Sequence, residues 1–169
     1  MKKEYRKILI RSVIIISLIF AAAIIQTAPR LLPELFGGRV FLLIPVVVSI
    51  CMFQSAFSGA AAGILAGAVW DVSASTPDGV LALLFGAAGF GVAFLSQKYM
   101  KNNIKTALLF CFAASLVFIA VKIFFNLYYF NFADTVYFFL SVYWPSFILT
   151  MAVSPFVYWF IRRTLKDKG

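Results

Sequence analysis

The sequence predicts an all-α polytopic membrane protein, a six-helix transmembrane bundle in a single integral membrane domain, residues 1–169. The chain is 63% hydrophobic and only 12% charged, and its mean hydropathy is +0.99. Both values lie far outside the range of soluble globular proteins. The apolar residues also form long uncharged runs between short polar segments, which is the pattern of membrane-spanning helices.

The first helix is expected at about residues 8–28. A basic segment, Met1–Arg11, precedes the apolar run Ser12–Ala28. That run is long for the apolar part of a signal peptide and further spans follow it, so we interpret it as a retained helix. Pro29–Arg39 contains two prolines and a Gly-Gly pair and is predicted to be a loop.

The run Val40–Trp70 contains no charged residue. As one straight helix it would extend roughly 46 Å, whereas the hydrocarbon core of a bilayer is about 30 Å thick. We therefore expect it to fold back at the polar, small-residue segment Gln54–Gly59. The resulting arms are residues 40–53 and 59–71, and the sequence leaves open whether they form a full or a re-entrant hairpin.

Three more helices are expected at residues 77–97, 106–125 and 135–161. The segment Thr76–Asp78 resembles a helix start, because it offers a hydroxyl cap, a proline and an acid. A basic loop, Lys98–Lys105, separates the fourth helix from the fifth. The last helix exceeds the length that a bilayer needs and contains Pro145 and Pro155, so we expect it to kink or tilt.

The distribution of charge predicts which segments share a side. Six passes place the N-terminus, the Lys98–Lys105 loop and the C-terminal tail together, and these hold twelve of the fifteen Lys and Arg residues. A single pass at residues 40–70 would move the two later clusters outside, against the positive-inside rule. We therefore expect both termini in the cytoplasm, basic segments in contact with anionic lipids, and Trp70 at the outer interface.

Three glycines stand four residues apart, at Gly59, Gly63 and Gly67, and the next step of four reaches Asp71. Steps of four stay on one helix face, so these residues form a stripe, which Gly79 follows in the next loop. Such a stripe allows close approach of another backbone. Two interpretations stay open: packing within the chain, or an interface with a partner subunit.

Asp71 is an acid at the end of an uncharged run, at a helix C-terminus where the dipole disfavours negative charge. It is either a water-contacting carboxylate, a cap for the following loop, or one half of an ion pair. Lys122 is the candidate partner, because both residues lie at compatible depths along their helices. The alternative for Lys122 is to extend its ammonium group to the interface.

Most reaction classes find no support in the sequence. There is no histidine, no phosphate-binding loop and no nucleophile elbow, so we expect no catalytic residue, no cofactor and no metal. Cys51 and Cys111 lie in apolar runs, where a thiol behaves as a small hydrophobic group. The basic residues flank apolar runs, which favours membrane orientation over nucleic-acid binding.

The segment Gly63-x-x-x-Gly67-x-x-x-Asp71, followed by a polar loop, Gly79 and Leu83, resembles the signature of the rod shape-determining protein MreD family. Small size, a basic N-terminus, six expected helices and a basic tail agree with this resemblance. The chain differs from many members at two places. Ala68 replaces a common leucine, and Arg39-Val40 stands where Pro-Asp often enters the second helix.

The resemblance implies a non-enzymatic subunit of the bacterial elongation machinery in the cytoplasmic membrane. Members bind MreC and, with it, link the MreB filament to RodA and penicillin-binding protein 2. Their fold is similar to that of the substrate-binding S-components of energy-coupling factor transporters. The alternative is therefore a vitamin-binding subunit of a transporter, with a polar pocket formed by Asp71, Asn126 and Asn131.

Overall fold

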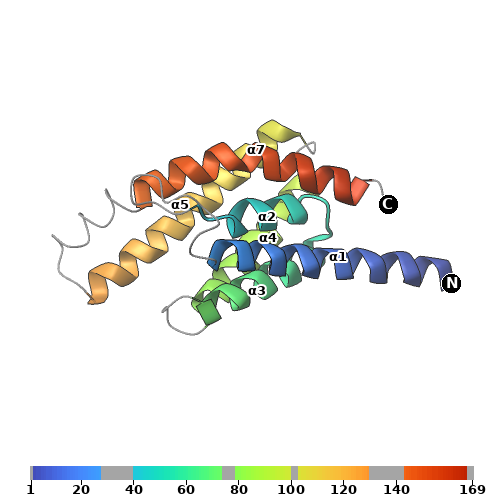
Figure 1. Ribbon diagram of the computed structural model, residues 1–169, viewed down its shortest axis with the longest axis horizontal. Helices are drawn as coiled ribbons and strands as arrows, with labels where there is room; N and C mark the ends of the chain where they lie inside the picture. The colour runs from blue at the N-terminus through green and yellow to red at the C-terminus, as the bar shows by residue number, and fades with distance from the viewer. Residues whose placement is uncertain (1, 28–39, 74–78, 100–102, 130–142, 167–169) are drawn as a thin grey trace.

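A computed structural model describes residues 2–27, 40–73, 79–99, 103–129 and 143–166 of the chain. Within these ranges every regular element is helical, and no strand is present. The helices, shown in Figure 1, are α1 (Lys2–Thr27), α2 (Leu43–Cys51), α3 (Ala56–Ser73), α4 (Val80–Lys98), α5 (Ile104–Tyr129) and α7 (Trp144–Lys166). The predicted all-α membrane bundle is confirmed.

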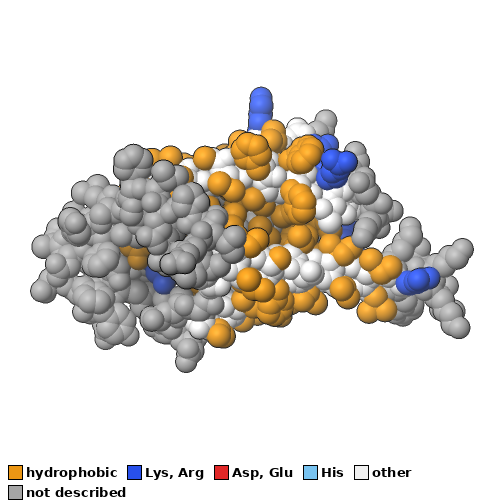
Figure 2. Space-filling view, in the orientation of Figure 1, with side chains coloured by type: hydrophobic (Ala, Val, Ile, Leu, Met, Phe, Trp, Pro, Cys, Tyr) orange, Lys and Arg blue, Asp and Glu red, His pale blue; other side chains and the backbone are white. Residues whose placement is uncertain are grey.

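Four segments of the described helices are long and apolar enough to cross a membrane: Leu9–Thr27, Val80–Lys98, Ile104–Phe124 and Trp144–Leu165. α3 contributes a shorter apolar helix, Ala56–Val72. Large apolar side chains are exposed on the outer surfaces of these helices, which suits contact with lipid. Figure 2 shows hydrophobic side chains over the middle of the visible face and the visible Lys and Arg atoms toward its margins. The chain is a multi-pass membrane protein.

The short helix α2 forms the centre of the bundle. All nine of its residues are buried, and it packs against α1, α3, α4, α5 and α7. A helix that is apolar on every side is stable only when other elements surround it. At about 1.5 Å per residue, α2 is only about 13 Å long, so its flanking segments complete the hairpin arm.

Both ends of this arm are fixed to α1. The Gln26 Oε1 accepts a hydrogen bond from the Leu43 amide at 2.9 Å, and the Arg11 guanidinium donates to the Phe53 carbonyl. Arg11 and Gln26 are fifteen residues apart on one helix, which corresponds to about 22 Å. The arm therefore runs beside most of the length of α1. The Arg11 cation also lies at the C-terminal end of α2, where the helix dipole favours it.

The turn between α2 and α3 lies at the same end of the bundle as both chain termini (Figure 1). Its carbonyl groups are hydrogen-bonded to α4: Ser96 Oγ donates to Met52 O at 3.2 Å, and Gln97 Nε2 donates to Gln54 O at 2.7 Å. Inside a membrane such backbone groups need partners within the protein. The chain does fold back between residues 51 and 56, as the length of the apolar run predicts.

Several observed bounds differ from the predicted ones. The hairpin helices are Leu43–Cys51 and Ala56–Ser73, α5 extends to Tyr129, and α7 continues to Lys166 with Pro155 inside it. α4 begins at Val80, after Gly79. The predicted helix start at Thr76–Asp78 and the beginning of the predicted sixth helix lie outside the described residues.

Candidate functional site

The glycine stripe of α3 packs against α4 within the same chain. A Cβ atom at Gly59 would lie 2.7 Å from the Ala93 Cβ and 2.9 Å from the Gly89 carbonyl oxygen. At Gly63 it would lie 2.7 Å from the Phe85 carbonyl carbon, and at Gly67 2.5 Å from the Ala82 Cα. None of these positions has room for one methyl group. The contact is therefore made by backbone against backbone, as small-residue stripes permit.

α4 supplies glycines of its own to this contact. A Cβ at Gly89 would lie 2.5 Å from the Gly59 carbonyl oxygen, and a Cβ at Gly86 would lie 2.6 Å from the Ile64 Cγ1. Residues early in α3 face residues late in α4, so the two helices run antiparallel. The structure therefore agrees with the first interpretation of the stripe, packing within the chain. Its three glycines are covered by α4.

Asp71 continues the stripe and caps the N-terminus of α4. Its Oδ1 accepts a hydrogen bond from the Leu81 amide at 3.3 Å, and its Oδ2 accepts one from the Ala82 amide at 3.0 Å. The N-cap residue Gly79 has φ of 89° and no side chain with which to cap the helix itself. Asp71 thus fills the place of a capping side chain from ten residues upstream. Its charge lies at the positive end of the α4 dipole.

Lys122 lies near this cap without contacting it. Its Nζ is 5.9 Å from the centre of the Phe118 ring, which stacks on the ring of Trp70, the residue before Asp71. Within the part of the chain that the structure describes, no hydrogen bond or salt bridge joins Asp71 and Lys122. The Asp71 carboxylate is instead engaged by two amides of α4. A direct Asp71–Lys122 ion pair stays a prediction.

An aromatic cluster, defined here as Phe41, Trp70, Phe85 and Phe118, lies next to the cap. The Trp70 ring stacks on Phe118 with centroids 4.8 Å apart, and it contacts Phe41 at 5.7 Å and Phe85 at 5.4 Å. Trp70 is only 9% exposed. Its ring is enclosed by side chains of the segment before α2, of α4 and of α5, so Trp70 packs inside the bundle. Its position at the outer interface stays a prediction.

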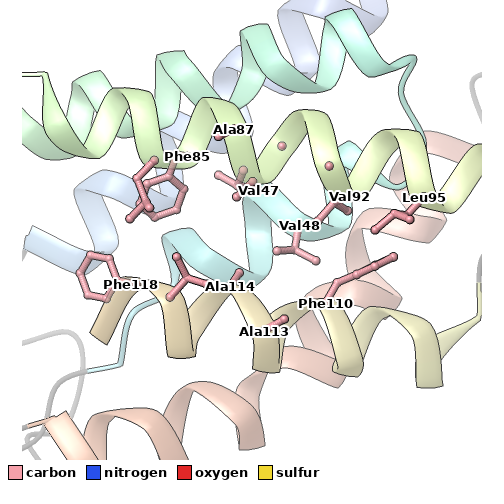
Figure 3. A pocket seen from close by; sticks show the side chains of 15 residues that line it. Val47, Val48, Phe85, Ala87, Val92, Leu95, Phe110, Ala113, Ala114 and Phe118 are labelled. Carbon is pink, nitrogen blue, oxygen red and sulfur yellow. The ribbon is translucent and has the colours of Figure 1, made fainter. Parts of the chain in front are cut away.

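A groove of about 270 Å³ separates α4 from α5, and the sequence reasoning missed it. Figure 3 shows Val47 and Val48 of α2 at its floor, with the two longer helices as its walls. All fifteen lining residues are apolar. The available signal was the small residues on the facing sides of both helices, including Ala87, Gly91, Ala113 and Ala114. We call this feature the α4–α5 groove.

Of the three residues of the predicted transporter pocket, the structure describes the side chain of Asp71 only. Asp71 is engaged as the cap of α4, while the side chain of Asn126 and the residue Asn131 lie outside the described part of the structure. Among the described residues there is no group of three His, Cys, Asp or Glu that could hold a metal ion. Both cysteines are buried, and the Cys51 thiol donates to the Gly59 carbonyl at 3.4 Å.

Comparison with known proteins places this arrangement in a family. The family model of the rod shape-determining protein MreD matches residues 6–166, which takes in nearly all of the six described helices. No curated protein and no solved structure matches the chain at a significant level. Because the family match covers almost the whole sequence, the chain belongs to the MreD family of rod shape-determining proteins.

Proposed function

We propose that this protein is a non-enzymatic scaffold subunit of the rod, or elongation, complex of a bacterium. In this role it binds MreC directly and helps to couple MreB filaments to the peptidoglycan synthases RodA and penicillin-binding protein 2. The observation that carries the proposal is the family match over residues 6–166, since the family determines rod shape.

The geometry supports a scaffold rather than a catalyst. Asp71, the acid of the signature, is engaged by two amides of α4, and the glycines of the signature are covered by the same helix. These residues are therefore used to build a rigid helix pair. A rigid pair presents its outer faces in a fixed arrangement, which a partner subunit can recognise.

The proposed orientation places both termini in the cytoplasm. The start of α1 and the end of α7 lie at one end of the bundle (Figure 1). Lys98, Lys105, Arg162 and Arg163 belong to the helix ends there. Positively charged residues are retained on the cytoplasmic side and attract anionic lipids. The basic end is accordingly the side from which MreB would be reached.

The surface that meets MreC must lie outside the glycine stripe, because α4 covers that stripe. Large side chains exposed on the bundle offer test positions on three separate helices: Leu83 of α4, Leu109 of α5 and Phe156 of α7. A photoreactive phenylalanine analogue at each position would report a neighbouring chain in native membranes.

Purification of the tagged full-length protein from native membranes tests the proposal. We expect MreC and the synthase subunits to co-purify, and at least one photoreactive position to cross-link to MreC. A tagged multi-pass protein from outside the complex serves as the control. Co-purification of an ATPase module without MreC would instead support the vitamin-transporter alternative, which the apolar lining of the α4–α5 groove does not favour.

A further inference from the structure

We propose that the α4–α5 groove binds one acyl chain of an anionic phospholipid, whose phosphate group lies at the basic end of α4 and α5. This inference concerns a lipid site and does not depend on the proposed scaffold role. It rests on the shape of the groove, on the difference between its two ends and on the charge at its open end.

The groove is long and apolar. It extends along α4 from Leu84 to Leu95, eleven residue steps that correspond to about 16 Å. It has a volume of about 270 Å³, and no polar side chain lines it. An extended hydrocarbon chain suits a slot of this length and lining.

The two ends of the groove differ. Phe85 and Phe118 lie at one end of the view in Figure 3, and their ring centroids are 6.3 Å apart. Trp70 stacks on Phe118 and contacts Phe85, which joins both walls at this end. Leu95 and Phe110 lie at the other end in the same view. The aromatic cluster thus closes one end of an apolar slot.

The opposite end leads to polar and basic residues. Lys98 is one turn beyond Leu95 on α4 and continues its lining face. Its Nζ lies over the rings of Phe94 and Tyr99, 5.6 and 5.5 Å from their centres, beside the groove. On α5, Asn103 and Thr106 continue the lining face toward its N-terminus in steps of three and four. Exposed Lys105 belongs to the first turn of α5 at this end, on another face of the helix. The sequence contains no Asp or Glu between residues 79 and 133. The local charge therefore favours a phosphate.

An apolar slot that ends in a cationic rim fits one class of occupant, a lipid with a hydrocarbon tail and an anionic head. The chain fills volume that α4 and α5 do not fill with side chains. The headgroup phosphate interacts with Lys98 and Lys105 at the membrane surface, where each such lysine contributes measurably to binding of anionic lipid.

Native mass spectrometry of the detergent-purified full chain tests the headgroup. We expect one dioleoylphosphatidylglycerol to be retained in preference to dioleoylphosphatidylcholine. The double variant K98Q/K105Q should reduce this preference about fivefold for each lysine removed. The double variant R162Q/R163Q removes the same charge from α7 at the same end of the bundle and should leave the preference unchanged. Equal losses in both variants would overturn the proposed headgroup site.

Filling the groove tests the acyl chain. Ala113→Phe places a large ring in the groove and should abolish retention of the lipid. Ala120→Phe is the matched control, because Ala120 is also an exposed alanine of α5, two turns further on and outside the lining. Unchanged retention in a folded Ala113→Phe variant, shown by its melting temperature, would overturn the proposal.

Photo-cross-linking tests the position of the acyl chain in the wild-type protein, with a phosphatidylglycerol that carries a diazirine in its acyl chain. Cross-links should concentrate on Val92, Leu95, Phe110 and Ala113. Labelling spread evenly over the exposed faces of all helices would overturn the proposal. So would a photoreactive residue at position 113 that cross-links to a partner protein instead of lipid in the native complex.

Discussion

α4 lies beside α3 and α5, and it packs against these two helices in opposite ways. On one side α3 approaches so closely that a methyl group at Gly59, Gly63 or Gly67 would overlap the backbone or Cβ atoms of α4. On the other side α5 stands off, and a groove of about 270 Å³ separates the two helices. The same helix is thus part of a closed contact and of an open one.

Small residues are present both between α3 and α4 and between α4 and α5. Their presence alone therefore does not determine which pair of helices packs in close contact. Along α3 and α4 the glycines meet in register, with Gly59 opposite Gly89 and Gly63 opposite Gly86. Along α5 the small residues Ala113 and Ala114 stand between two bulky ones, Phe110 and Phe118. Phenylalanines above and below the alanines keep α5 away from α4. Close helix contact in a membrane depends on van der Waals packing, so this spacing leaves a gap.

The aromatic cluster is where the closed and open contacts meet, and breaking it should have the largest effect. Trp70→Ala removes the ring that stacks on Phe118 and contacts Phe85. We expect the free energy of unfolding in detergent to fall by about 3 kcal/mol, as for other buried aromatic residues. The substitution should also increase the protease sensitivity of α5 more than that of α3.

Trp159→Ala is the matched control for this prediction. Trp159 is 60% exposed on α7, so the same change in residue type removes little packing. Its effect should stay within about 0.5 kcal/mol. Similar losses at positions 70 and 159 would mean that the cluster does not join α5 to the α3–α4 pair.

A methyl group in the closed contact should have the next largest effect. In Gly63→Ala the new Cβ would meet the Phe85 carbonyl group, which is backbone and has no rotamer to change. We expect a loss of about 2 kcal/mol in the free energy of unfolding, within the usual range for over-packed sites. A thermal melt monitored by circular dichroism measures it. A neutral or stabilising effect would contradict the backbone-to-backbone contact.

Much of this contact was predictable from the sequence, and the groove was not. The spacing of Gly59, Gly63 and Gly67 defines one helix face, and the length of the run from Val40 to Trp70 requires a fold-back. The burial of α2 was harder to predict, because lipid tails are as apolar as the protein core. Apolar patterning therefore does not separate a central helix from a lipid-facing one.

The role of Asp71 shows a second limit. Its residue type and position indicated an acid that needs a partner, and a cap was one of the interpretations. Its partners are the amides of Leu81 and Ala82, and they become available only once α4 has returned antiparallel to α3. The capped helix begins nine residues downstream of Asp71, at Val80, so the local capping rules applied to Thr76–Asp78 could not indicate it.

Removing the cap should have a moderate effect, localised to one end of the closed contact. Asp71→Ala should reduce the free energy of unfolding by about 1 kcal/mol, because a lost N-cap leaves amide groups unpaired. Hydrogen exchange should accelerate at the Leu81 and Ala82 amides. The Ala107 amide, bonded to the Asn103 carbonyl at 3.0 Å, is the internal control. Asp71→Asn, which retains one acceptor oxygen, should lie between wild type and alanine.

Charge reversal at position 71 distinguishes two roles of Asp71, as a cap of α4 and as a partner of Lys122 in an ion pair. If Asp71 acts mainly through the amides of α4, the reversal Asp71→Lys should place a cation at the positive end of a helix dipole. Adding Lys122→Asp should then leave most of the defect in place. Full rescue by the double reversal would show that the direct Asp71–Lys122 pair, and not the cap, dominates.

The smallest predicted effect has the opposite sign and lies on the open side of α4. A Cβ at Gly91 would meet no atom within 4 Å, and Gly91 lines the groove. Gly91→Ala should therefore raise the free energy of unfolding by about 0.5 kcal/mol, because alanine is the better helix former. Gly63→Ala is the same change of residue type, but it lies in the closed contact between α3 and α4. Opposite signs at the two positions, measured in the same detergent, would establish that one side of α4 is closed and the other open, whereas equal losses would place another helix in the groove.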